Sequence, residues 1–409
     1  MDKLKRLVLQ EVRKTFAERI HGLLNEKLLV AGVDMPAEVR EKYVEHLMSG
    51  SDEAFVWNEC PKHLEDVTLT LSEEELERVL SSHREFLQNE LPKVVTDFIK
   101  HASADLRKSL VAEWPAEYVL QQAEYDACLY RLEQRWGEAL DLLRLLLSVA
   151  KDTVVQSAER NRRSKAKRNR HLWFALLELQ ARACQVTSEI IVLIENGYAD
   201  GAIARWRTLH EVGVVASVLA EYGDEAAERY LAHEIVDVKH SIDEEERRNT
   251  LLKRRPIAKR HLRNILDAYN AALKKYGKDF DERFGWASKY LNKRRPTFVD
   301  LERIADQAIL RSDYKLASHN VHATSASITC KLGVPEGSQI MLAGASNFGL
   351  AEPGGRAATT LATIMTLHHA SVPKVEDVIV MQVMADLAQR TTAAFGRADR
   401  QLRREVKNE

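Results

Sequence analysis

Apolar residues recur at helical spacing along most of this chain. The clearest run steps by four and three residues alternately, through Leu172, Leu176, Leu179, Ala183, Val186, Ile190 and Leu193. This spacing places the apolar side chains on one side of a helix. Asn196 and Gly197 follow, and both tolerate the left-handed backbone that ends helices. A second helix is predicted over 200–221, and the short connection predicts an antiparallel helical hairpin.

The same periodicity predicts an all-α fold. Further helices are expected at 224–248, 258–276, 298–308, 313–332, 356–370 and 375–406. A helical bundle over 116–409 is expected to carry the function, preceded by an N-terminal helical extension over 1–115. One short strand is predicted at 67–71, and the Gly-rich stretch 333–355 is predicted to be a long loop. The basic stretch 159–170 is interpreted as a linker or an exposed helix end.

Composition adds limits on the class of protein. Of 409 residues, 45% are apolar and 30% are charged, enough to bury a sizeable core. A net charge of −1 excludes a uniformly basic, histone-like nucleic-acid binder. No run of about 18 apolar residues predicts a membrane span, and the charged start of the chain does not resemble a signal peptide. The cysteines are widely spaced, which favours reduced thiols in a cytoplasmic protein: Cys60, Cys128, Cys184 and Cys330.

The second helix of the hairpin carries the first candidate site. Arg207, His210 and Glu211 share one helix face, with Arg205 near the same edge. Apolar neighbours make this face part of a core, where charged groups pair or perform chemistry. One interpretation is a buried Arg207–Glu211 bridge that only holds the hairpin together. The other is a catalytic or binding site.

A polar ridge in the predicted helix 313–332 is the second candidate. Tyr314, Ser318 and His322 follow one another at four-residue steps. Polar groups on a helix that packs in a core need partners. We therefore expect this ridge to meet the first face, which would bring Arg207, Glu211, Ser318 and His322 together.

Weaker signals lie elsewhere in the chain. His233, Asp237 and His240 could ligate a metal, but no fourth ligand is evident, and a solvated helix face is favoured. No metal or other cofactor is therefore predicted. Basic runs within 160–170, 253–260 and 293–295 could contact phosphates, although each is also typical of a solvated helix end. The acidic run 243–246 would offset part of their field.

Two resemblances bear on function. Six landmarks carry the first: Trp136-Gly-Glu-Ala139, Gly197-Tyr198 to Glu211, Arg229-Tyr-Leu-Ala-His233, Gly285-Trp-Ala287, Tyr314-x3-Ser318-x3-His322 and Leu350-Ala-Glu-Pro-Gly354. In these landmarks the chain resembles a bacterial all-helical domain family of unknown function. That likeness implies Arg207, Glu211, Ser318 and His322 as site residues and transfers no reaction. The Arg205-x4-His210 spacing also resembles HEPN ribonucleases, helical proteins that dimerise and cleave RNA without metal. The polar residue that usually follows the arginine is replaced here by Trp206.

These observations predict a metal-independent endoribonuclease or RNA-binding effector of the toxin or phage-defence type. His322 or His210 would act as base, Arg207 and Arg205 would hold phosphate, and Glu211 would orient Arg207. The expected partners are RNA, a second copy of the chain, and an antitoxin or defence protein, with no membrane partner. The alternative is a non-catalytic helical scaffold or sensor.

Overall fold

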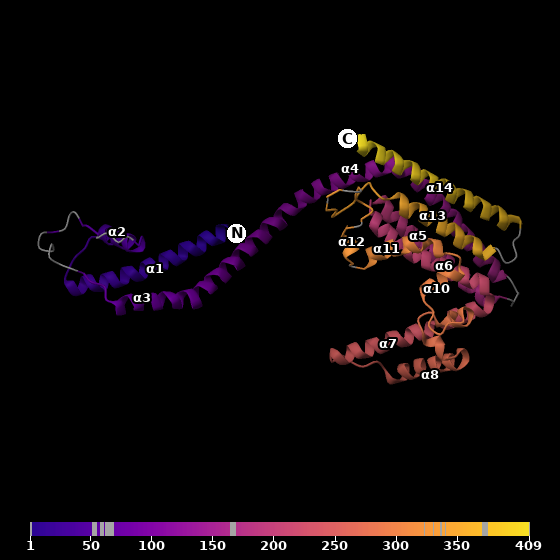
Figure 1. The fold of residues 1–409 in the computed structure, drawn as a ribbon, viewed down its shortest axis with the longest axis horizontal. Coiled ribbons are helices and arrows are strands. Elements are labelled where there is room, and N and C mark those ends of the chain that lie inside the picture. Colours follow the sequence, from indigo (N-terminus) through magenta and orange to yellow (C-terminus); the bar gives the residue numbers. More distant parts are fainter. Residues whose placement is uncertain are drawn as a thin grey trace. The chain divides into compact units, whose positions relative to one another are not determined.

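The computed structural model describes residues 2–50, 55–57, 61, 69–163, 169–322, 324–329, 331–335, 338–339, 341–369 and 375–408 (Figure 1). Every regular element among them is a helix, which confirms the predicted all-α class. Part of the strand expected at 67–71 lies outside the described residues, and 69–71 form no strand. The chain divides into two units, 1–121 and 122–409, which share the long helix α4 (Leu91–Arg163).

The first unit contains few elements and a small core. Its helices are α1 (Asp2–Ala31), α2 (Ala37–Met48), α3 (Glu73–Glu85), a π-helical turn (Phe86–Glu90) and the first part of α4. A capping box at Ser72 opens α3, where the Glu75 amide donates to the Ser72 hydroxyl and the Glu75 carboxylate accepts from the Ser72 amide. The buried apolar side chains pack between α1 and α2: Leu24, Leu28, Met35 and Val44.

The second unit is a helical bundle with an arm. Beside the rest of α4, its longer helices are α5 (Arg170–Glu195), α6 (Ala199–Ala232), α7 (Glu234–Leu251), α8 (Lys259–Tyr276), α13 (Ala351–His369) and α14 (Val375–Asn408). Short elements connect them: turns of 3-10 helix at Lys278–Asp281, Gly285–Ala287 and Ala308–Leu310, with α9 (Ser288–Leu291), α10 (Phe298–Ile304), α11 (Arg311–Val321) and α12 (Ser325–Thr329). Helices α7 and α8 form an arm on the side of the unit opposite α14 (Figure 1).

The predicted hairpin forms the centre of the bundle. Helix α5 ends at Glu195, and Gly197 takes the left-handed conformation, with φ +76°, that the sequence suggested. Helix α6 then returns antiparallel to α5, so that Gly201 lies against Leu193. The helix bends where Gly223 leaves helical geometry. The largest completely buried side chains include Trp136, Trp206, Phe280 and Phe395.

A glycine lets α13 and α14 approach closely. A Cβ atom placed on Gly354 would lie 2.4 Å from ring carbons of Phe395. The Phe395 ring lies 6.0 Å from that of Trp136 on α4. Gly354 therefore allows one aromatic side chain to join three helices of the core. Helix α13 begins at Ala351, so the loop predicted at 333–355 ends earlier than expected.

The helix predicted over 313–332 is interrupted. Helix α11 ends at Val321, and His322 has extended backbone angles (φ −109°, ψ 138°). The Thr324 amide donates to the His322 carbonyl, and the Thr324 hydroxyl lies 3.1 Å from the His319 ring. These local bonds compete with helix continuation, as Thr and Ser side chains often do. The polar ridge expected from Tyr314 to His322 is therefore broken at its last member.

Two further expectations concern the chain as a whole. Among the described residues, no helix combines the length and apolar content needed to cross a lipid bilayer. Cys128 and Cys184 are free thiols, whereas Cys60 and Cys330 lie outside the described residues.

Candidate functional site

A histidine and a glutamate meet inside the second unit. His210, on α6, places its Nε2 atom 3.1 Å from Oε1 of Glu302 on α10. Each side chain is only 1% exposed. The other carboxylate oxygen of Glu302 accepts a hydrogen bond of 2.9 Å from Arg311, the first residue of α11. One buried carboxylate thus links three helices, and both of its oxygens have a partner.

Aromatic rings enclose the imidazole of His210. The ring stacks on Trp206 at 5.3 Å and lies 5.7 Å from Tyr314 and 6.0 Å from Phe298. This burial lowers the pKa of His210, and it outweighs Glu302, which acts in the opposite direction. His210 is therefore neutral near pH 7. It also has no open side through which a substrate could approach.

Arg207 and Glu211 lie at the edge of the same cluster. The ion pair expected from their spacing forms, with 3.3 Å between Arg207 Nη2 and Glu211 Oε1. The Tyr314 hydroxyl donates a 2.6 Å hydrogen bond to the same Glu211 oxygen, and the Arg207 guanidinium lies 4.8 Å from the Tyr314 ring centre. Burial raises the pKa of Tyr314, and so does the Glu211 carboxylate. We call these residues the His210 cluster: Arg207, His210, Glu211, Glu302, Arg311 and Tyr314.

Most polar groups of the His210 cluster already have partners. Arg311 also lies over Tyr314, at 5.0 Å, so one phenol ring contacts two guanidinium groups. Each arginine also pairs with a carboxylate, Arg207 with Glu211 and Arg311 with Glu302. Among the described residues, the Nε atom of Arg207 is buried without a hydrogen-bond partner, although both guanidinium groups face a carboxylate. The geometry is that of a polar network that ties α6, α10 and α11 together.

Two expected members do not join this cluster. The Ser318 hydroxyl donates to the Tyr314 carbonyl of its own helix, at 2.7 Å. His322 is exposed just beyond the end of α11, eight residues after Tyr314, which corresponds to about 12 Å along a helix axis. In the described part of the chain, no hydrogen bond, ion pair or ring contact joins His322 to Arg207 or Glu211. The expected meeting of Arg207 with His322 is therefore not found.

Arg205 also points elsewhere. Its guanidinium pairs with Glu189 on α5 and contacts the Thr208 hydroxyl at 3.3 Å. His210 instead faces Glu302. Five residues correspond to about 140° around a helix, so the Arg-x4-His spacing directs the two side chains to different neighbours within this chain.

The sequence did not single out Glu302 or Arg311. Glu302 lies between Leu301 and Arg303 in a short helix, next to the charged Asp300, and such a segment usually indicates a solvated carboxylate. Only the buried position of His210 could have suggested that a carboxylate must come from another helix.

The metal option at His233, Asp237 and His240 is not supported. His233 Nε2 lies 3.0 Å from the Glu282 carbonyl oxygen, and His240 Nε2 lies 3.2 Å from Asp281. Asp237 is 75% exposed and 4.0 Å from His233. Across the described ranges, no group of three or more His, Cys, Asp or Glu side chains is arranged to hold a metal ion.

A different feature carries unpaired charge. Between residues 239 and 263 there are nine Lys and Arg residues against four Asp and Glu. Six of the cations lie in the α7–α8 connection and the first turns of α8, all of them exposed and outside the ion pairs found for the described residues. We call them the basic tip: Lys253, Arg254, Arg255, Lys259, Arg260 and Arg263.

The acidic run 243–246 does not neutralise this tip. Its four carboxylates are used within the arm by Lys239 (2.5 Å), Arg247 (2.7 Å), Arg248 (3.8 Å) and the Ile257 amide (2.8 Å). The negative charge of the run 243–246 thus offsets mainly the cations of α7, and the tip keeps an excess of positive charge.

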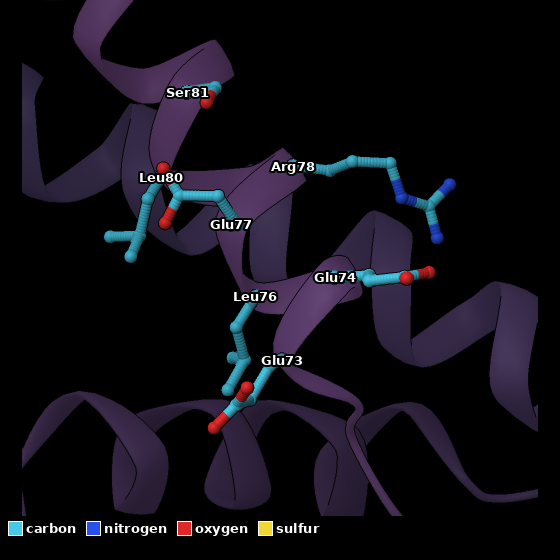
Figure 2. Close-up of a pocket in the computed structure, with 7 residues that line it drawn as sticks. All are labelled: Glu73, Glu74, Leu76, Glu77, Arg78, Leu80 and Ser81. Atoms are coloured by element: carbon cyan, nitrogen blue, oxygen red, sulfur yellow. The ribbon is translucent and has the colours of Figure 1, made fainter.

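Hollows in the surface are a further class of candidate site. One, of about 820 Å³, follows α3. Glu73 and Glu77 lie beside Leu76 and Leu80, and Glu74 and Arg78 extend to the other side of the helix (Figure 2). Its described lining comes from one helix, and no acid–base pair converges on it.

A second hollow, of about 480 Å³, lies between α6, α7 and the turn at 283–286. Trp286 and Tyr230 line it, with their rings 5.2 Å apart. The buried Arg229 beside it donates to the carbonyls of Trp286 (2.9 Å) and Gly285 (3.4 Å). Arg229 therefore holds this turn in place.

Residues 174–339 match DUF5677, described as a family of unknown function. The predicted likeness to an uncharacterised domain family is thus confirmed for this segment, which contains the whole His210 cluster and the basic tip. No curated protein and no solved structure gives a significant match to the chain. The family description transfers no activity, so function has to be argued from the residues.

Proposed function

We propose that this protein binds RNA through the basic tip of its α7–α8 arm. The observation that carries the proposal is the set of six exposed cations outside the ion pairs of the described residues. Three of the four nearby acids pair with Lys239, Arg247 and Arg248, and the fourth, Glu246, accepts from the Ile257 amide. A polyanion gains from such a surface because binding releases the counterions condensed on its phosphates. The protein as a whole is nearly neutral, so the arm directs phosphates to one place.

RNA is favoured over a membrane surface as the polyanion. An interfacial helix needs a free apolar face to enter the lipid. The apolar side of α8 is instead used for packing, since Tyr269, Ala272 and Leu273 lie against the core of the unit. Leu251 and Leu252 remain exposed near the tip, and liposomes of anionic lipid therefore belong in the test.

The test is fluorescence anisotropy with a labelled single-stranded RNA of about 20 nucleotides, measured at several salt concentrations. Arg254→Gln, Arg255→Gln and Arg260→Gln together should weaken binding at least tenfold. They should also reduce the slope of log K against log salt by about 2, because each lost phosphate contact removes about 0.7.

The matched control removes three exposed arginines of α14 that each have a carboxylate partner. These are Arg390→Gln, Arg397→Gln and Arg403→Gln. Equal affinity for the tip variant and the control, or binding to anionic liposomes but not to RNA, would overturn the proposal.

The same samples address cleavage. We propose that any endoribonuclease activity is independent of metal, so that RNA would be cut in excess chelator. Among the imidazoles of the candidate set, only His322 is exposed, whereas His210 is enclosed. His322→Ala should then abolish cleavage while leaving RNA binding intact. Uncut RNA would leave binding as the function and remove the nuclease.

A non-catalytic scaffold is the second candidate, and the His210 cluster favours it. Every carboxylate in the cluster is paired, and the innermost pair is 1% exposed. Such a network stabilises a particular arrangement of helices without reacting. In this case Glu211→Ala would lower the melting temperature and leave RNA binding unchanged.

A further inference from the structure

The part of α4 that belongs to the first unit has an unusual surface. Every residue from 105 to 121 is exposed, including the apolar ones. A helix surrounded by water is normally polar. Here it carries large apolar side chains at four-residue steps, each more than half exposed: Leu106, Leu110, Trp114 and Tyr118.

These four side chains form a continuous ridge. Residues four apart are neighbours on a helix surface, and the rings of Trp114 and Tyr118 lie 5.9 Å apart. Ridges of four-residue steps pack into the equivalent grooves of another helix, in the commonest class of helix packing. The ridge therefore has the form of one half of a helix–helix interface.

Charge indicates what the other half is. Arg107 and Glu117 lie on the same face as the ridge, and each is five residues from Ala112. If a second copy of the helix packs antiparallel, with the two-fold axis level with Ala112, Arg107 of each copy faces Glu117 of the other. A parallel arrangement would place like charges together.

The same two-fold register matches the apolar side chains. Leu106 then lies level with Tyr118, and Leu110 level with Trp114, so that aromatic and aliphatic side chains alternate across the interface. A two-fold interface must be complementary to itself in this way. A partner other than a second copy of the chain would not require the charges and the apolar side chains of this helix to be symmetric about one residue.

We propose that this ridge of α4 is the surface on which a second copy of the chain docks, in antiparallel orientation. The proposal is independent of RNA binding, because the ridge and the basic tip lie in different units.

The test is sedimentation velocity of the full chain over a range of concentrations. Leu110→Glu should raise the dimer dissociation constant at least tenfold. The control is Val119→Glu, which changes an exposed valine (65% exposed) on the opposite side of the same helix and should leave the constant unchanged. Circular dichroism checks that both variants remain helical.

A charge exchange tests the orientation. Arg107→Glu alone and Glu117→Arg alone should each weaken association, and the two together should restore it. A chain that stays monomeric at every concentration would overturn the proposal. So would equal effects of Leu110→Glu and Val119→Glu, or a double charge variant that is no better than the single ones.

Discussion

Removing the Glu302 carboxylate should destabilise the second unit strongly. In Glu302→Ala, the Nε2 atom of His210 loses its partner at 3.1 Å, and Arg311 loses its partner at 2.9 Å. Breaking a buried charge pair by removing one member costs about 3–5 kcal/mol. Arg311 is 31% exposed and can be hydrated, so we expect the lower end, about 3 kcal/mol. For a domain of this size that corresponds to a fall in melting temperature of roughly 6–12 °C.

Tryptophan fluorescence is a suitable readout, because Trp206 stacks on His210. The control is Glu138→Ala, which removes an exposed carboxylate paired with Arg397 and should change stability by less than about 0.5 kcal/mol. Glu302→Gln should fall between the two, since the amide keeps one acceptor oxygen. If Glu302→Ala melts together with the control, the cluster does not hold the helices as described.

Three further perturbations test the His210 imidazole, the close approach at Gly354 and the dependence of stability on metal. The melting temperature should fall as the pH drops from 7.5 to 5.5, and it should fall less in His210→Gln. The pKa of His210 is lower in the folded protein, so the unfolded chain takes up more protons below about pH 6.5. This difference costs up to about 1.4 kcal/mol of stability per pH unit. An equal pH dependence in both proteins would contradict the neutral, buried imidazole. Gly354→Ala should lower the free energy of unfolding by about 1–3 kcal/mol, because the added methyl group clashes with Phe395. The control is Gly344→Ala, which has open space around it and should change stability little. Equal melting temperatures of the two variants would refute the close approach. Extensive dialysis against a chelator should leave the melting curve unchanged, and a lower melting temperature would reveal a metal bound to the chain.

The helices could be predicted because periodicity is a local property. The run from Leu172 to Leu193 and the stop at Gly197 were enough to predict the central hairpin. The prediction failed at His322, where hydrogen bonds of Thr324 compete with the helix over a few residues. Periodicity cannot detect such a break, since the polar positions keep their spacing on both sides of it.

The candidate site could be predicted only in part. Spacing within one helix was enough for the Arg207–Glu211 pair, because residues four apart meet whatever the rest of the fold does. The same geometry, applied to Arg205 and His210, would have indicated their separation, since five residues turn a helix by about 140°. The partner of His210 could not be found in this way.

The sequence by itself determined the all-α class, the hairpin, and the contacts made within a single helix turn. Only the tertiary structure decided that Glu302 faces His210 across ninety-two residues and that His322 stays outside. It also decided that three of the acids 243–246 pair with cations of α7, which leaves the six cations of the basic tip with one carboxylate, Glu246, beside them. The reason is physical: helix periodicity shows which side of a segment is buried, whereas the partner of a buried charge depends on how separate helices pack.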